Sequence, residues 1–345
     1  MSQTTVFILL SLIMLAVLIL PFLTRKVEEN LELFLCVMGV AASAVSGVLG
    51  MELVHESLIE PLKITAAVLV AGVLFKYTRR FIRSGIEKAV ENLHFGFFMF
   101  LVVVFLGLVS SVITAIIASL VLVEIVSGLH MDRKHEVFYV VVACFAIGLG
   151  AALTPLGEPL STILVSKLKS HPDVGFFYPM KLLGFFIIPG IVALGVMAAF
   201  RKGSPSVGTV GAPDADETLK DVVVRGVKVY VFVMALVLLG AGFKPVIDTY
   251  LVKVPAPVLY WINMISAILD NATLTAAEIS PAMDNTQIRD VIMGLCISGG
   301  MLIPGNIPNI ISAGKLKIRS GEWARVGVPL GLGLMLVYFA ILLAV

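Results

Sequence analysis

The sequence predicts an all-α polytopic membrane protein built from inverted repeats. Hydrophobic residues make up 59% of the chain and charged residues 14%, whereas soluble domains average about 45–50% and about 25%. Several apolar stretches reach the roughly 20 residues that a helix needs to cross a bilayer. A polar signature with prolines and glycines also interrupts apolar sequence in both halves, which is typical of the binding centre of a secondary transporter. We expect about eight spanning helices plus two re-entrant hairpins.

Residues 1–60 are predicted to hold two N-terminal scaffold helices, at about 5–23 and 33–50. The first apolar stretch has no basic residue before it and no small-residue cleavage site after it, so we expect it to remain as a helix. A short acidic loop is expected at 52–60, where three glutamates occur without Lys or Arg. These are Glu52, Glu56 and Glu60.

The basic residues predict which loops face the cytoplasm. A helix at about 62–76 is followed by a basic cluster, and further basic residues occur near 133 and between 315 and 325. The residues are Lys76, Arg79, Arg80, Arg83, Lys88, Arg133, Lys134, Lys315, Lys317, Arg319 and Arg325. By the positive-inside rule these segments are cytoplasmic, which places the N-terminus outside.

The first inverted repeat is expected to occupy residues 61–200. Both ends of the apolar block at 95–130 then lie inside, so this block crosses twice or forms a re-entrant hairpin with its tip near Thr114. A span at about 136–166 is broken between Thr154 and Pro159, and a helix at about 178–200 returns to the cytoplasm. This topology places Lys167 and Lys169 outside, against the charge rule.

A polar stretch at 201–221 is predicted to be a cytoplasmic linker, and the second inverted repeat follows at 222–345. The expected order is a helix, a hairpin, a broken span and a last helix. Their expected ranges are 222–243, 255–280, 287–313 and 326–345. The inverted orientation brings the two tips and the two breaks near the bilayer midplane, one set reached from each side.

The two broken spans carry matching sequence, Thr154-Pro155-Leu156-Gly157-Glu158-Pro159 and Pro304-Gly305-Asn306-Ile307-Pro308-Asn309. Their prolines remove backbone donors, which releases carbonyl groups that can coordinate a cation, while the following half-helix presents amides to an anion. Irregular backbone at membrane depth is tolerated where it packs in protein or lines a wet cavity. The alternative interpretation is a proline kink that only shapes helix packing.

Asp270 is the leading candidate for a cation- and proton-binding carboxylate. It lies with Asn271, Thr273 and Thr275 in a hairpin too apolar for a surface loop, and a charged group at the bilayer centre costs about 2.5–3.5 kcal/mol on insertion scales. Burial favours the neutral acid and a bound cation favours the carboxylate, so proton and cation compete for one group, as antiport requires. The alternative is a helix cap at the hairpin turn.

Other side chains complete the predicted site. Glu158 is a second candidate ligand or proton carrier, with a hydrated position near the vestibule as the alternative. Glu124 and Glu278 are candidate proton relays, with a position near the interface as the alternative. Neutral oxygen donors suit hard cations such as Na⁺. The neutral candidates are Ser110, Ser111, Thr114, Thr154, Ser161, Ser266, Asn271, Thr273, Asn306 and Asn309.

Other function classes lack sequence support. The chain has no P-loop, no nucleophile elbow and no metal-ligand spacing, so we expect neither an enzyme nor a resident metal or cofactor. Cys36, Cys144 and Cys296 lie in apolar segments and are read as buried small side chains. The net charge of +2 gives no indication of nucleic-acid binding. The expected partners are membrane lipid, a small inorganic cation and the proton.

Two motifs carry a resemblance to the ion transporter superfamily of Na⁺/H⁺ antiporters and of arsenite, citrate and dicarboxylate carriers. The segment from Ser266 to Asn271 is similar to its hairpin tip, and Leu153 to Pro159 to its broken helix; the chain looks most like its branch of cation transporters. The resemblance implies Na⁺ binding at the tips and breaks, an elevator motion and a homodimer. The first hairpin departs from the pattern, since Thr114-Ala115 stands where the second has Asp270-Asn271.

We therefore expect a monovalent cation (Na⁺)/H⁺ antiporter in a prokaryotic cytoplasmic membrane. The runner-up is a Na⁺-coupled symporter of a carboxylate or oxyanion, which would use half-helix amides, hydroxyls or bound Na⁺. No Arg or Lys is evident at the predicted midplane, which disfavours that alternative. A channel or a non-transporting scaffold would not account for the matched breaks.

Overall fold

The computed structural model has only helical regular elements in the part of the chain that it describes. That part comprises residues 3–24, 26–27, 30–62, 65–66, 69–70, 73, 93–129, 131–168, 171–201, 219–246, 254–269, 271–279, 281 and 283–344. Within it, six helices are long and apolar enough to cross a membrane, against the expected number of about eight. Two further apolar helices, α3 and α6, have only 16 and 15 residues. The described part of the chain is thus all-helical in its regular elements, with the character of a polytopic membrane protein.

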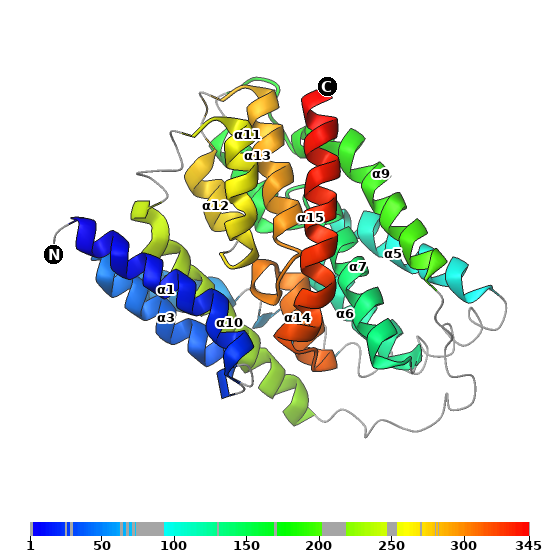
Figure 1. The fold of residues 1–345 in the computed structure, drawn as a ribbon, viewed down its shortest axis with the longest axis horizontal. Coiled ribbons are helices and arrows are strands. Elements are labelled where there is room, and N and C mark those ends of the chain that lie inside the picture. Colours follow the sequence, from blue (N-terminus) through cyan, green and yellow to red (C-terminus); the bar gives the residue numbers. More distant parts are fainter. Residues whose placement is uncertain are drawn as a thin grey trace.

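Helices α1 (Gln3–Leu23), α3 (Leu31–Ser46) and α10 (Leu219–Val246) lie together at one side of the molecule (Figure 1). The contact between α3 and α10 is close, because a Cβ added at Gly39 would lie 2.8 Å from Leu238 Cβ. Ser43 Oγ also donates to Leu238 O at 2.7 Å. The helix that opens the expected second repeat therefore packs mainly on an N-terminal helix.

The acidic loop expected at 52–60 is wrong, because residues 51–62 are helical. Leu53, Ser57 and Pro61 recur every fourth residue and are buried, whereas the three glutamates occupy the exposed face. The glutamate spacing that suggested a loop is the polar face of an amphipathic helix. The helix expected at 62–76 and the basic cluster after it lie largely outside the described residues, as do Lys169 and most of the 201–221 linker.

The described residues from 93 to 201 form five helices in the predicted order. They are α5 (Phe95–Ile113), α6 (Ala115–Leu129), α7 (Arg133–Ala151), α8 (Pro159–Lys167) and α9 (Tyr178–Phe200). Helices α5 and α6 form a hairpin that turns at Thr114, whose φ is 77°. With 19 residues, α5 is about 28 Å long, so this arm alone can cross the hydrocarbon. The irregular residues 152–158 separate α7 from α8, and α9 has the predicted bounds.

The second half repeats this order of elements. Its elements are α11 (Ala256–Ile262), η2 (Asn263–Ala267), α12 (Asn271–Glu278), α13 (Asn285–Ser298), η3 (Ile303–Gly305), α14 (Ile307–Leu316) and α15 (Ser320–Ala344). A hairpin is again followed by a broken helix and then by one long helix. Helix α15 begins earlier than the predicted residue 326, because its first turn is polar and hydropathy does not detect it.

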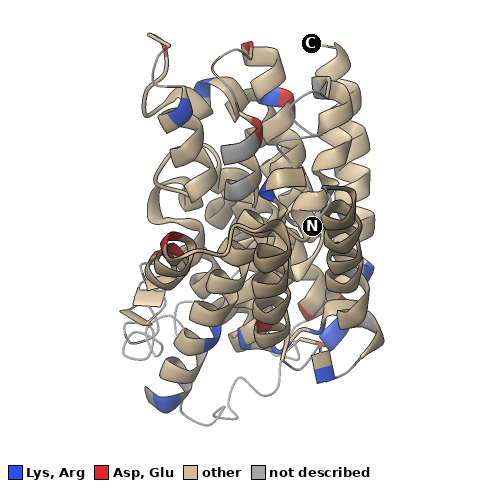
Figure 2. Ribbon diagram, turned by 90° about the vertical axis from the view of Figure 1, so that its left-hand side faces the viewer, with Lys and Arg blue, Asp and Glu red and all other residues tan. Residues whose placement is uncertain are grey.

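Side-chain bonds join the helix ends into two groups. At one end, Arg133 of α7 pairs with Glu322 of α15 at 2.8 Å and donates to Leu316 O at the end of α14. At the other end, Tyr178 of α9 donates to Asn285 Oδ1 of α13 at 2.7 Å. The first end includes basic residues that lie at the bottom of the ribbon in Figure 2.

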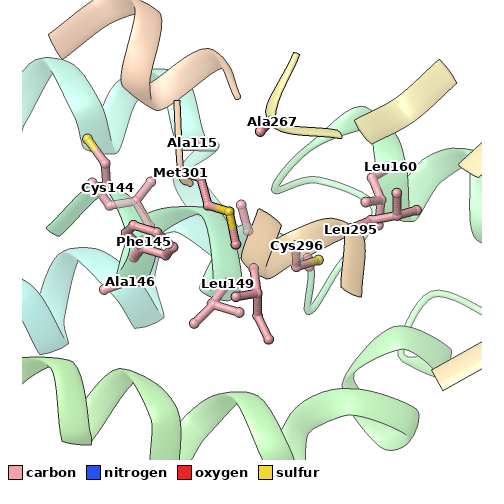
Figure 3. Close-up of a cluster of buried hydrophobic side chains, with 14 of the residues drawn as sticks. Ala115, Cys144, Phe145, Ala146, Leu149, Leu160, Ala267, Leu295, Cys296 and Met301 are labelled. Atoms are coloured by element: carbon pink, nitrogen blue, oxygen red, sulfur yellow. The ribbon is translucent and has the colours of Figure 1, made fainter. Parts of the chain in front are cut away.

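The core lies between the two broken helices. Almost every residue of α7 from Val137 onward is buried, as is α13 from Val291 onward. Figure 3 shows Phe145 and Leu149 of α7 beside Met301 and Cys296 of the second half. Apolar packing therefore holds the two breaks in fixed positions relative to each other.

Candidate functional site at the two helix breaks

The first break has a compact set of local hydrogen bonds. Thr154 Oγ1 bonds to Ser111 O of the hairpin and accepts from Leu156 N at 3.2 Å. Ser161 of α8 donates back to Ala152 O at 2.6 Å. Glu158 then adopts an extended conformation as the N-cap of α8, and Pro159 begins the helix, where its missing N–H costs no hydrogen bond.

The tip of the first hairpin is bonded directly to this break. Ala115 N donates to Gly157 O at 3.0 Å, and Ser110 Oγ donates to Ile147 O of α7 at 3.0 Å. The hairpin tip and the broken helix therefore form one packed unit.

The second break is built in the same way. Asn309 of α14 donates from Nδ2 to Gly299 O at 2.8 Å and to Leu302 O at 2.9 Å. In the second hairpin, Ser266 Oγ bonds to Asn271 Oδ1 and lies 3.3 Å from Leu295 O of α13. The carbonyl groups freed by the break are thus partly satisfied by side-chain amides and hydroxyls.

Corresponding residues of the two breaks have closely similar geometry. Glu158 has φ −154° and ψ 162°, and Asn306 has φ −155° and ψ 148°, each as the N-cap of the half-helix that follows. Ser161 and Asn309 occupy the same turn of α8 and α14, and both donate back into their own break. The clearest difference between the two sites is the carboxylate at 158 where the second break has an amide.

Each break faces the other half of the molecule. Helix α8 packs on α12, and α14 packs on α6. The carboxyl group of Glu158 is within electrostatic range of the Cys296 thiol on α13. Reciprocally, Asn306 Nδ2 lies 2.7 Å from the point where a Cβ would sit on Gly148 of α7. The two breaks and the two hairpin tips therefore share one buried region.

Most of the residues predicted for the site meet in this region and are buried. These are Ser110, Ser111, Thr154, Glu158, Ser161, Ser266, Asn271, Asn306 and Asn309. Thr114 lies at the first tip and is half-buried. Asp270, the leading candidate, lies outside the described residues, as does the side chain of Thr273 in α12. Glu124 and Glu278 are buried on the second arms of the hairpins, roughly two helical turns from the tips.

Two side-chain amides in the shared region each have one atom without a hydrogen-bond partner among the described residues. These atoms are Nδ2 of Asn271 and Oδ1 of Asn309. A buried polar atom without a partner costs about 1–3 kcal/mol, so an unexplained one marks a place for a water or a ligand. Oxygen atoms such as Asn309 Oδ1 are the donors that hard monovalent cations accept. The described residues bring together no group of three His, Cys, Asp or Glu able to hold a metal.

Two buried polar residues and one buried cation were not predicted from the sequence. Asn263 and Ser298 are fully buried, and Ser298 Oγ donates to Asn263 O at 2.6 Å. Arg289 is 7% exposed near the start of α13 and stacks over the Phe186 ring at 5.1 Å. The available signal was an isolated asparagine inside the apolar run from Val258 to Ile268.

Comparison with known proteins gives one match. A protein-family model described as "Protein of unknown function (DUF1646)" matches residues 7–345. No curated protein matches the chain significantly.

Proposed function

The chain belongs to the DUF1646 family, and we propose that it is a secondary active transporter that exchanges a monovalent cation, Na⁺, for protons. The observation that carries the proposal is the crossed packing of two broken helices around one buried polar region. Matched helix breaks in the two halves of a membrane protein are typical of transporters with alternating access.

We interpret residues 95–200 and 256–344 as inverted repeats, each with a re-entrant hairpin. The half-helix α8 of the first half packs on the hairpin arm α12 of the second, and the half-helix α14 of the second half packs on the hairpin arm α6 of the first. A two-fold relation between the halves requires this reciprocal pairing. The bonds at the helix ends have the same reciprocity, since α7 begins beside the start of α15 and α13 begins beside the start of α9.

The cation site is proposed to lie where the tips meet the breaks. Asp270 supplies the central carboxylate, and its neighbours Leu269 and Asn271 are buried. Asn309 Oδ1 and Glu158 supply further oxygen ligands from the half-helices. Glu158 also places a negative charge at the N-terminus of α8, the position that an anionic substrate would need. This residue favours a cation as the substrate over a carboxylate or oxyanion.

An elevator motion follows from the way the helices group. We propose that α1, α3 and α10 form the scaffold and that the two repeats form the moving unit. Helix α10 packs mainly on α3 and has smaller contacts with α12 and α14. The interface along which the repeats would slide against the scaffold is therefore small. The scaffold is also the expected site of a homodimer contact, and the expected location is a prokaryotic cytoplasmic membrane.

The test is cation-evoked proton movement in proteoliposomes, scanning Na⁺, Li⁺ and K⁺, with wild type beside Asp270→Asn. We expect wild type to release protons on addition of one cation and Asp270→Asn to give the signal of empty liposomes, because the site loses the negative charge that binds the cation. Asp290→Asn is the matched control, since Asp290 pairs with Arg289 at 2.9 Å and should leave exchange unchanged.

A different result would point elsewhere. If none of the cations evokes proton movement by the wild type, but the wild type accumulates a carboxylate or oxyanion when Na⁺ is present, the protein is a symporter. Full exchange by Asp270→Asn would rule out that carboxylate as the central ligand of the cation.

A further inference from the structure

We propose that Glu278 and Asn263 form a separate proton site inside the second hairpin, and that Glu278 carries the proton exchanged for the cation. The inference rests on the proposed transport function but concerns residues away from the helix breaks. Glu278 ends α12, and Asn263 begins η2 on the opposite arm.

The side chain of Asn263 has a fixed orientation. Its Nδ2 lies 3.3 Å from Val291 O on α13, and its main-chain oxygen accepts from Ser298 Oγ at 2.6 Å. Turning the amide over would place Oδ1 against the Val291 carbonyl, which repels it. Oδ1 therefore stays an acceptor, and it has no hydrogen-bond partner among the described residues.

The carboxyl group of Glu278 lies beside this amide. Glu278 is 3% exposed, and neither of its carboxyl oxygens has a hydrogen-bond partner among the described residues. An ionised carboxylate here would leave a negative charge and an orphan acceptor together in the protein interior, which is costly. A protonated Glu278 instead supplies an O–H, the donor that Asn263 Oδ1 lacks.

The helices packed on α12 bring few charged groups to the site. From α8, Lys167 donates to Ile279 O at 3.3 Å, one residue after Glu278. From α13, Arg289 is directed to Leu342 O and the Phe186 ring, and Asp290 is paired with it. Helix α10 carries Lys244 in its last turn. Lys167 is thus the cation placed to favour the ionised state when the hairpin shifts.

Helix α8 connects this proton site to the cation site. Its first turn follows Glu158 at the break, and its last turn carries Lys167. The break and Lys167 lie at opposite ends of one helix that packs on α12, so a shift of α8 on α12 when a cation binds would change the distance between Lys167 and Glu278. Cation binding and proton release are then linked through one rigid nine-residue helix.

Two measurements on purified protein test the proposal. Infrared difference spectra across a pH titration should contain a carboxylic-acid C=O band in wild type that is absent in Glu278→Gln and retained in the control Asp290→Asn. Asn263→Leu should move this band without removing it, because the acid O–H loses its acceptor. In proteoliposomes, Glu278→Gln should retain ²²Na⁺ counterflow at equal pH but lose cation-evoked proton movement.

The possible failures are distinguishable. A wild type without counterflow of any cation overturns the transport function, whereas the infrared band still decides whether Glu278 holds a proton. No acid band assigned to Glu278, or proton movement that persists in Glu278→Gln, overturns the proton site. Retained counterflow also shows that the variant is folded.

Discussion

At Gly305, the second break leaves no space for a side chain. An added Cβ would lie 2.5 Å from Gly299 O and 2.8 Å from Ser266 O, a carbonyl of the hairpin. Real Cβ atoms do not approach a carbonyl oxygen this closely, so the hairpin and the break would have to separate. The glycine is what allows the tip of one element to rest against the backbone of another.

We therefore predict that Gly305→Ala lowers the free energy of unfolding by about 1–3 kcal/mol, the usual cost of overpacking. Thermal unfolding in detergent provides the measurement. Gly314→Ala in α14 is the matched control, because a Cβ there meets no atom within 4 Å, and it should be neutral or stabilising by up to about 1 kcal/mol. Equal effects of the two variants would contradict the close packing at the break.

Individual site residues were predictable where a polar residue interrupts an apolar stretch of sequence. Ser266, Asn271 and Asn309 stood out for this reason, and the structure brings them together. Asn263 and Ser298 are equally buried but were missed, because their partners are carbonyl groups on other elements that sequence does not reveal. The partner of a buried polar group depends on tertiary packing, which a single sequence does not specify.

Among the helices, the end of α14 depends on one side chain of α7. Arg133 donates to Leu316 O at 2.9 Å and to Lys317 O at 2.6 Å while paired with Glu322. Lys317 ends the helix with a left-handed φ of 51°, and the arginine satisfies the carbonyl groups that the last turn leaves free.

We predict that Arg133→Ala destabilises the protein by about 1.5–3 kcal/mol, the range for hydrogen bonds to charged groups. Tyr178→Phe, which removes only the bond to Asn285 at the opposite end, should cost about 1 kcal/mol. Unfolding temperatures of the two variants beside Lys134→Ala, an exposed neighbour, provide the comparison. An Arg133→Ala protein as stable as Lys134→Ala would mean that this cap contributes nothing.

The order of the helices along the chain was predictable, but which helices pack on one another was not. The positions of the hairpins, the breaks and α9 followed from hydropathy and proline spacing. The pairing of α10 with α3 did not, because both surfaces are apolar and the close contact depends on Gly39 and Gly242. The helix at 51–62 was read as a loop because its charges were considered without their spacing.

In the whole molecule, the two ends of the bundle differ in charge. Among the described residues, the end with Arg133 and Glu322 carries a series of basic residues that outnumber its acidic ones, whereas the end with Tyr178 has no such basic series. The basic residues of the first end are Lys134, Arg201, Lys315, Lys317, Arg319 and Arg325. Lys167 lies at the second end, where it contacts Ile279 O, against the charge rule.

We predict that cysteines at Asp173 and Lys317 react with an impermeant maleimide from opposite sides of the membrane. Lys317→Cys should be accessible from the cytoplasm, in a background with the three native cysteines replaced, because the positive-inside rule assigns the basic end to that side. Inverted vesicles and whole cells give the two readouts. Labelling of both positions from one side would contradict the crossing of α9 and α15 between the two ends.

The crossed pairing of the half-helices has a consequence for biogenesis. The ribosome releases α8 long before α12, the helix on which α8 packs, and α6 likewise precedes α14. A nascent chain that contains only the first half thus leaves α8 and α6 without the helices of the second half on which they pack. Translocon-inserted intermediates of this protein should therefore need protection by a chaperone or insertase until synthesis of the second half, and chains truncated after α9 should be degraded.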